Sequence, residues 1–326
     1  MTSFSWSQAP HPIVALAPMA GVTDASYRQL IKRIAPEVIV YTEFLSTDAI
    51  SYGAKRTLDM ISFDTEIERP FIVQVFGHDP DHFLKAAKII EELGADGIDI
   101  NMGCPAAKVV SSCHGSALLK DPKLAAELVH ATVKAVNIPV TVKIRIGVRE
   151  NEYLAPALAK LAQGCGVSGV IVHARPVSKR HSGRPDWEGL RQTVAAVSIP
   201  VIGNGGVNVP NDAEDFLKIS GCAGVSVGRA AIGDPGIFKR IRHYLSTGER
   251  LPEATHQDKL ETLAQHVAWA AEFFGERTGL LRLRKIVPYY VAGFPMATSF
   301  RAQANRIATL MEWTVLLDKT REALHV

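Results

Sequence analysis

Residues 200–228 read PVIGNGGVNVPNDAEDFLKISGCAGVSVG. In this stretch two apolar runs, PVIGN (200–204) and GVSVG (224–228), enclose an amphipathic segment. Runs rich in Val and Ile that are nearly continuously apolar are typical of parallel strands covered on both faces. The stretch therefore predicts one strand–helix–strand unit of a parallel sheet.

The same alternation extends over the first three quarters of the chain. Three intervening segments begin with the Asp-Pro pairs at 79–80, 121–122 and 234–235, which place an N-cap before a first-turn proline. The apolar runs lie at 13–18, 38–43, 71–76, 97–101, 140–145, 169–174, 200–204 and 224–228. Eight such units, with no G-x-G-x-x-G after the first, predict an α/β fold, a (β/α)8 TIM barrel rather than an open doubly wound sheet.

The pattern changes near residue 246, beyond which no buried-strand run occurs. The remaining segments have helical spacing of apolar residues and are broken by Pro288, Gly293 and Pro295. We therefore expect a barrel domain over 1–245 and a smaller all-α domain over 246–326, joined by LSTGERLPEAT (245–255).

Composition restricts the class of protein. The 326 residues are 47% hydrophobic and 21% charged, which excludes dominant disorder, a collagen-like chain and a disulfide scaffold. Secretory and membrane-spanning patterns are absent, and no C-x-x-C pair occurs among Cys104, Cys113, Cys165 and Cys222. We expect a monomeric cytoplasmic protein with no membrane contact and no metal site.

Polar side chains close several of the apolar runs. In a barrel of this kind the active site lies at the C-terminal ends of the strands. Each residue alone has an ordinary structural explanation, such as a helix cap or a core histidine. Together they predict a site that includes Glu43, Gln74, Asn101, Lys143 with Arg145, His173 and Asn204.

Glycines follow the last two predicted strands, in IGNGGV (202–207) and SVGRAAIGDP (226–235). Glycine lets the backbone approach an anion, and barrels often bind phosphate after strands 7 and 8. Arg229 adds a charge that pairs with phosphate, although plain turn glycines are the alternative. If the ligand is FMN, Lys143 suits the N1–C2=O edge of its ring and Gln74 the pyrimidine-like edge.

Cys104 lies in a Gly-Cys-Pro turn just beyond the fourth predicted strand, within INMGCPAAKV. A thiol over the barrel mouth is open to a ligand and acts as nucleophile, base or proton donor. Cys113 and His114 either approach the same site or are loop residues. Cys165 and Cys222 are interpreted as structural.

At this point the motifs resemble the tRNA-dihydrouridine synthases, most similarly the bacterial B-type enzymes. The resemblance rests on APMAGVTDASYR, YTEF, VQVFG, GIDINMGCPAAKV, GSALLKDP, VTVKIRIG, VIVHAR, GNGGV and VGRAAIGDP, and spans about residues 13–240. It implies an FMN-bearing barrel with a helical tRNA-binding domain. Such an enzyme reduces the C5=C6 bond of uridine in tRNA, and NADPH or NADH recharges the flavin.

The resemblance also implies roles for individual residues. A hydride passes from FMN N5 to uridine C6, Cys104 donates the proton to C5, and Asn101 lies beside the substrate base. The loop PVSKRHSGRPDW (176–187) and the Cys113-His114 pair depart from the family pattern, so neither receives a role. The residues matching the FMN contacts are Pro18, Met19, Ala20, Gln74, Lys143, His173, Asn204, Gly205, Gly206, Gly228 and Arg229.

The net charge of +3 is unevenly distributed. Residues 277–306 contain no Asp or Glu and carry +6, from Arg277, Arg282, Arg284, Lys285, Arg301 and Arg306. The interleaved aromatic residues are Tyr289, Tyr290, Phe294 and Phe300. Such a patch predicts contact with RNA phosphates and stacking on exposed bases, with Arg282, Arg284 and Lys285 as substrate contacts. The alternative is a solvated helical face with core aromatics.

The residues alone are also compatible with two other functions. One is an FMN-dependent barrel that acts on a free small molecule, as dihydroorotate dehydrogenase or an ene-reductase does, and that enzyme would not need the basic helical region. The other is a non-enzymatic RNA-binding protein, which leaves Cys104 and Lys143 without a purpose.

Overall fold

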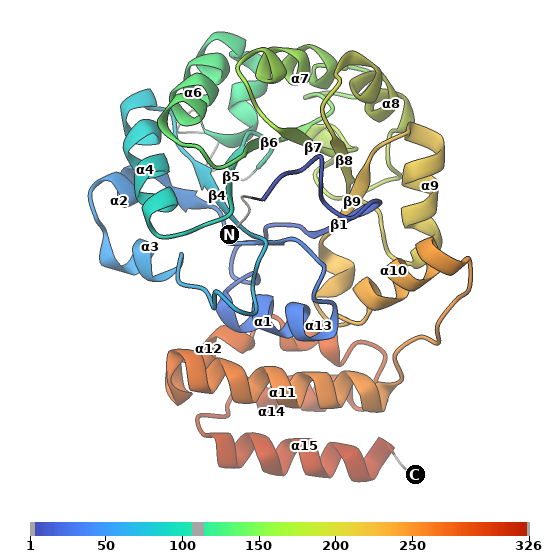
Figure 1. Ribbon diagram of the computed structural model, residues 1–326. Helices are drawn as coiled ribbons and strands as arrows, with labels where there is room; N and C mark the ends of the chain where they lie inside the picture. Colours follow the sequence, from blue (N-terminus) through green and yellow to red (C-terminus); the bar gives the residue numbers. More distant parts are fainter. Residues whose placement is uncertain (1–3, 106–113, 325–326) are drawn as a thin grey trace.

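The computed structural model describes residues 4–105 and 114–324. Its parallel sheet runs in the order β1-β9-β8-β7-β6-β5-β4-β2, and a bridge between Ala15 and Ile39 joins the two ends into a barrel (Figure 1). This confirms the predicted (β/α)8 fold. The strands are β1 (Ile13–Leu16), β2 (Val40–Tyr41), β3 (Leu45–Ser46), β4 (Phe71–Phe76), β5 (Gly97–Asn101), β6 (Val140–Arg145), β7 (Gly169–His173), β8 (Val201–Asn204) and β9 (Gly224–Val227).

The second predicted run differs from the others because it forms two short strands. Both β2 and β3 pair with β4. Between them the Thr42 hydroxyl accepts a hydrogen bond from the Gln74 backbone, and the Glu43 carboxylate accepts one from the Gly21 backbone. Side chains thus take over backbone partners where the strand is interrupted.

Helices cover the outside of the barrel (Figure 1). Asp24, Asp79, Asp121 and Asp186 accept hydrogen bonds from first-turn amides of their helices, as the Asp-Pro pairs at 79–80 and 121–122 predicted. The pair at 234–235 does not begin a helix; α10 starts two residues later. The helices are α1 (Ala25–Ile34), α2 (Thr47–Ser51), α3 (Lys55–Asp59), α4 (Pro80–Glu92), α6 (Pro122–Ala135), α7 (Ala155–Gly164), α8 (Trp187–Ala196), α9 (Pro210–Ser220) and α10 (Ile237–Thr247).

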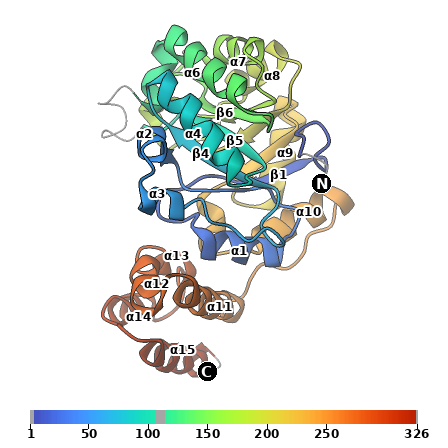
Figure 2. The same cartoon turned by 60° about the vertical axis from the view of Figure 1, so that its left-hand side comes forward.

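The C-terminal region is helical and lies against the barrel beside α1 (Figure 2). Residues 248–255 connect it to α10. No helix in the described part of the chain combines the length and apolarity needed to cross a membrane. The helices are α11 (His256–Phe274), α12 (Glu276–Leu283), α13 (Val287–Tyr290), α14 (Ala297–Ala304) and α15 (Leu310–Leu324).

Strand register places the polar residues of the barrel in rows. Arg145 is in register with His173, His173 with Asn204, and Asn204 with Ser226, along β6 to β9. One layer deeper, Asn101 is in register with Lys143. Register partners in a parallel sheet point to the same face, so these side chains converge at one end of the barrel.

Candidate active site

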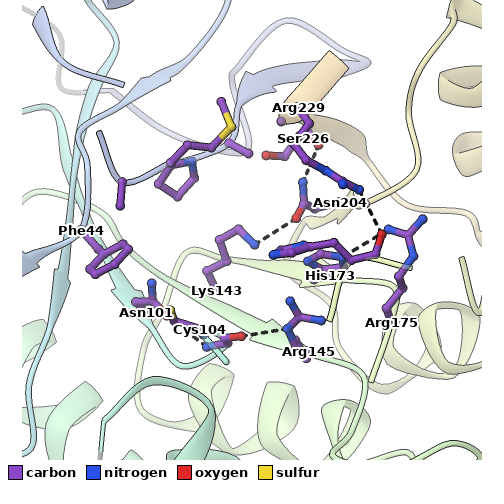
Figure 3. A pocket seen from close by; sticks show the side chains of 18 of the residues that line it. Phe44, Asn101, Cys104, Lys143, Arg145, His173, Arg175, Asn204, Ser226 and Arg229 are labelled. Carbon is purple, nitrogen blue, oxygen red and sulfur yellow. Dashed lines mark hydrogen bonds between the residues drawn. The ribbon is translucent and has the colours of Figure 1, made fainter. Parts of the chain in front are cut away.

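A cavity of about 400 Å3 opens at the C-terminal ends of the strands. Its lining includes every residue predicted to be catalytic or to bind cofactor, together with Asn101. Figure 3 labels Asn101, Cys104, Lys143 and His173 among them. Of the strand-end residues predicted for the site, Glu43 is not part of this lining. The predicted residues that the fold brings together here are Pro18, Met19, Ala20, Gln74, Asn101, Cys104, Lys143, His173, Asn204, Gly205, Gly206, Gly228 and Arg229.

Lys143 is half-buried at the floor of this cavity. Burial, and next the neighbouring Arg145 guanidinium, lower the pKa of Lys143 to about 8. Its Nζ donates to Asn204 Oδ1 at 3.0 Å, and Asn204 Nδ2 donates to the Ser226 carbonyl at 2.7 Å. The Ser226 hydroxyl lines the cavity and is buried, yet it has no hydrogen-bond partner among the described residues. Because buried polar atoms are nearly always hydrogen-bonded, this unpaired hydroxyl suggests that a polar group of a ligand binds beside it.

The glycine turn after β8 leaves no room for a side chain. Gly205 and Gly206 have φ of +96° and +111°, a region that favours glycine. A Cβ on Gly205 would lie 2.5 Å from the His173 ring, and one on Gly206 would lie 2.7 Å from Pro185 Cγ. The backbone can therefore come close to a ligand at this wall of the cavity.

Positive charge is concentrated beside the glycine turn. Arg229 Nη2 donates to the His181 carbonyl at 3.0 Å, and Arg175 also lines the cavity. Burial, and then nearby Lys and Arg groups, hold the pKa of His173 well below its usual range and lower that of His181 to about 4. Such a wall suits an anion.

The Cys104 turn is held from two sides. Asn101 Oδ1 accepts from the backbone amides of Gly103 and Cys104, at 3.1 and 3.0 Å. Arg145 Nε donates to the Gly103 carbonyl at 2.8 Å. The half-buried cysteine thus lines the cavity in a turn fixed by hydrogen bonds (Figure 3).

Residues 15–324 match the sequence model of a family described as dihydrouridine synthase (Dus). The chain belongs to the dihydrouridine synthase family. It is 41% identical over 292 residues to tRNA-dihydrouridine synthase B of Pseudomonas aeruginosa, covering 90% of this chain and 87% of that protein. It is 38% identical over 298 residues to tRNA-dihydrouridine synthase B of Xanthomonas axonopodis pv. citri, covering 91% and 89%. A probable tRNA-dihydrouridine synthase of Rickettsia bellii is 39% identical, covering 90% and 89%.

Among solved structures, a 2-naphthoyl-CoA reductase complex matches with a TM-score of 0.54 at 11% identity, covering 71% of this chain and 50% of that one. That likeness shows a shared fold. Membership of the dihydrouridine synthase family makes the protein an oxidoreductase, as predicted.

Besides Ser226, sequence reasoning missed four contributors to the site. Arg175 and His181 line the cavity, although neither residue was assigned a role from the sequence. Phe44 also lines the cavity, and Asp99 lies beneath it. The available signals were an acidic residue within the apolar run GIDIN and the basic character of residues 175–184.

The predicted substrate contacts on the helical region lie outside the cavity. Arg282 forms an ion pair with Asp24 at 3.4 Å and stacks over Phe274. Arg284 Nη2 donates to the Ile307 carbonyl at 3.2 Å. Lys285 is exposed, and a Cβ added to Gly21 would overlap its Nζ. Arg282 and Arg284 are thus engaged within the protein, whereas Lys285 lies beside the cavity rim.

The expectation that the basic segment offers four aromatic side chains to RNA bases is wrong for three of them. Tyr290, Phe294 and Phe300 are buried in the core of the helical region. Tyr289 alone of the four is exposed, at 44%. Their spacing reflects the apolar face that packs the helices together.

The remaining cysteines and histidine lie as follows. Cys165 is at the end of α7 and Cys222 is buried before β9, both away from the cavity. His114 faces His78, with 2.6 Å between Nε2 and Nδ1, and is outside the cavity lining. Cys113 lies outside the described residues.

Proposed function

We propose that this protein reduces the C5=C6 bond of uridine in tRNA to dihydrouridine, with FMN in the barrel cavity and NADPH, or NADH, as reductant. One observation carries the proposal: the Cys104 thiol, the Lys143 ammonium and a glycine- and arginine-lined anion cradle line one cavity. The names of the bacterial relatives specify tRNA as the substrate of those proteins.

The cavity fits FMN on three counts. The turn at Gly205 and Gly206 with Arg229 suits the phosphate, and Lys143 suits an electron-rich ring edge. The unpaired Ser226 hydroxyl suits a polar group of the ligand. FMN bound there supplies the hydride chemistry that no amino-acid side chain can perform.

Cys104 is assigned as the general acid that protonates C5 of the base. A thiol is suited to this step because it holds a transferable proton at neutral pH, and the turn fixes its backbone before the substrate arrives. Asn101, at the end of β5, also lines the cavity and is assigned to hold the base. The Pro18–Ala20 backbone and His173 complete the wall around the ligand.

The RNA partner is assigned to the side of the rim nearest the helical region. Lys285 lies against Gly21, next to Ala20 of the cavity lining. Its exposed ammonium is placed to contact a phosphate while a base flipped out of the folded tRNA enters the cavity. We further propose that the enzyme is a monomer and works in the cytoplasm, where its substrate is.

The test uses the purified protein with added FMN, NADPH and tRNA that lacks dihydrouridine. We expect flavin absorbance on the protein and uridine that has gained two hydrogen atoms, detected by mass spectrometry of nucleosides. Free uridine and free orotate or dihydroorotate serve as parallel substrates. A protein that binds no flavin, or that converts a free pyrimidine but leaves tRNA unchanged, overturns the proposal.

A further inference from the structure

Asp99 is a buried acid that the proposed chemistry does not use. It lies on β5 with 0% of its surface exposed and is absent from the cavity lining. Oδ2 accepts from Gln74 Nε2 and Oδ1 accepts from Thr141 Oγ1, both at 2.6 Å. Gln74 and Thr141 are its register neighbours on β4 and β6. A charged group in the middle of a barrel is costly, so its presence there needs an explanation.

Hydrogen bonds connect this carboxylate to the Cys104 turn. Gln74 Nε2 donates to Asp99, and Gln74 Oε1 accepts from Asn101 Nδ2 at 3.0 Å. Asn101 Oδ1 in turn accepts from the backbone amides of Gly103 and Cys104. Two side-chain amides therefore lie in series between the carboxylate and the turn.

The orientation of both amides is determined from either end of this series. At one end an ionised carboxylate only accepts, so the nitrogen of Gln74 must face Asp99. At the other end backbone amides only donate, so the oxygen of Asn101 must face the Cys104 turn. The two requirements agree at the Gln74–Asn101 contact, where oxygen meets nitrogen.

We propose that Asp99 is a positioning residue that fixes the amide orientations of Gln74 and Asn101 and, through them, the Cys104 turn. The inference deepens the proposed function, on which it rests for the role of the thiol. It has a consequence for the ligand. With its oxygen used twice, Asn101 offers the cavity its remaining N–H, which suits a ring carbonyl oxygen and disfavours an amino group.

Two variants separate positioning from packing. In Asp99→Asn an N–H replaces one acceptor of the carboxylate. If the new amide nitrogen faces Gln74, it meets the Nε2 group of Gln74, and both groups are donors. If it faces Thr141 instead, the Thr141 hydroxyl must accept a hydrogen bond where it now donates one. Combining Asp99→Asn with Gln74→Glu reverses this one hydrogen bond. The new carboxylate at position 74 still accepts from Asn101, and one negative charge stays near Lys143.

Thr141→Val is the matched control, because it removes the other hydrogen bond of Asp99 and leaves the series to Cys104 intact. The readout is the rate of Cys104 alkylation by iodoacetamide, measured by peptide mass spectrometry on the full chain saturated with FMN, without reductant or tRNA. Saturation keeps flavin occupancy equal among the variants, since Gln74 lines the same cavity. Cys165, which is half-buried at the end of α7, is the internal reference. Activity on tRNA is measured separately.

We expect Asp99→Asn to change the Cys104 alkylation rate by about fivefold, the factor that one hydrogen bond produces in an equilibrium. The control and the combined variant should stay within about twofold of the wild type. The inference is overturned if Asp99→Asn alkylates Cys104 at the wild-type rate. It is also overturned if the alkylation rate of the combined variant is no closer to wild type than that of Asp99→Asn. If Asp99→Asn does not fold, the combined variant tests the inference by itself. A Cys104 alkylation rate in that variant unlike the wild-type rate then refutes the inference. Failure of the proposed function is distinguishable from failure of this inference, because in that case the wild-type protein itself makes no dihydrouridine.

Discussion

Arg145→Lys keeps a positive charge beside the cavity but removes the geometry of the guanidinium. Arg145 is 2% exposed and donates to three carbonyls, those of Gly103 at 2.8 Å, Pro176 at 3.2 Å and Arg180 at 2.7 Å. A lysine reaches one of these positions at a time, so two charged hydrogen bonds are lost. At about 1.5 kcal/mol each, the low end for charged groups, the variant loses about 3 kcal/mol of unfolding free energy.

The assay is urea unfolding near neutral pH, with Arg191→Lys as the control. Arg191 pairs with Glu188 on the exposed face of α8, where the same exchange should cost less than about 0.5 kcal/mol. Because Gly103 adjoins Cys104, dihydrouridine formation by Arg145→Lys should also slow. An unfolding midpoint equal to that of wild type would show that the guanidinium does not tie the Cys104 turn to the loop after β7.

The remaining predictions concern burial, charge and the glycine turn. Glu68→Ala leaves the Arg28 guanidinium buried without its carboxylate and should cost about 3–5 kcal/mol in urea unfolding, whereas Asp59→Ala, on an exposed pair, should cost less than about 1 kcal/mol. Lys143 has a folded pKa of about 8 against 10.5 unfolded, so the unfolded state holds the extra proton between these values and stability rises with pH there. Lys143→Met should therefore have a higher melting temperature than wild type near pH 7, and this difference should shrink toward pH 10. The variant should also be inactive. A melting-temperature difference that does not change with pH refutes the lowered pKa of Lys143. Gly206→Ala places a Cβ 2.7 Å from Pro185 and should weaken FMN binding at least about tenfold in a fluorescence titration; wild-type affinity would contradict the cradle.

Much of the barrel was predictable because its strands are buried on both faces. That burial makes each strand a nearly continuous apolar run, so a polar residue at a strand end, such as His173 or Asn204, stands out in the sequence. The split of the second strand was not predictable. It depends on Thr42 and Glu43 accepting from the backbone of segments distant in the sequence.

The parts of the site that escaped prediction depend on tertiary contacts. Asp99 sits inside an apolar run, and only the fold shows that its neighbours Gln74 and Thr141 donate hydrogen bonds to it. The aromatic residues of the basic segment show the opposite error. Tyr290 and Phe300 have the composition of a stacking surface, but helix packing buries them. Composition alone cannot say which face of a helix meets the core.

The most direct test of the central claim compares the wild type with Cys104→Ala, both loaded with FMN, in dihydrouridine formation on tRNA. Mass spectrometry of the nucleosides gives the rate, and the flavin spectrum confirms that both proteins carry the cofactor. Removing a general acid lowers a rate by about 10²- to 10⁴-fold, and the account predicts a loss in that range with flavin retained. A Cys104→Ala protein that makes dihydrouridine as fast as the wild type would contradict the assignment of the thiol as proton donor.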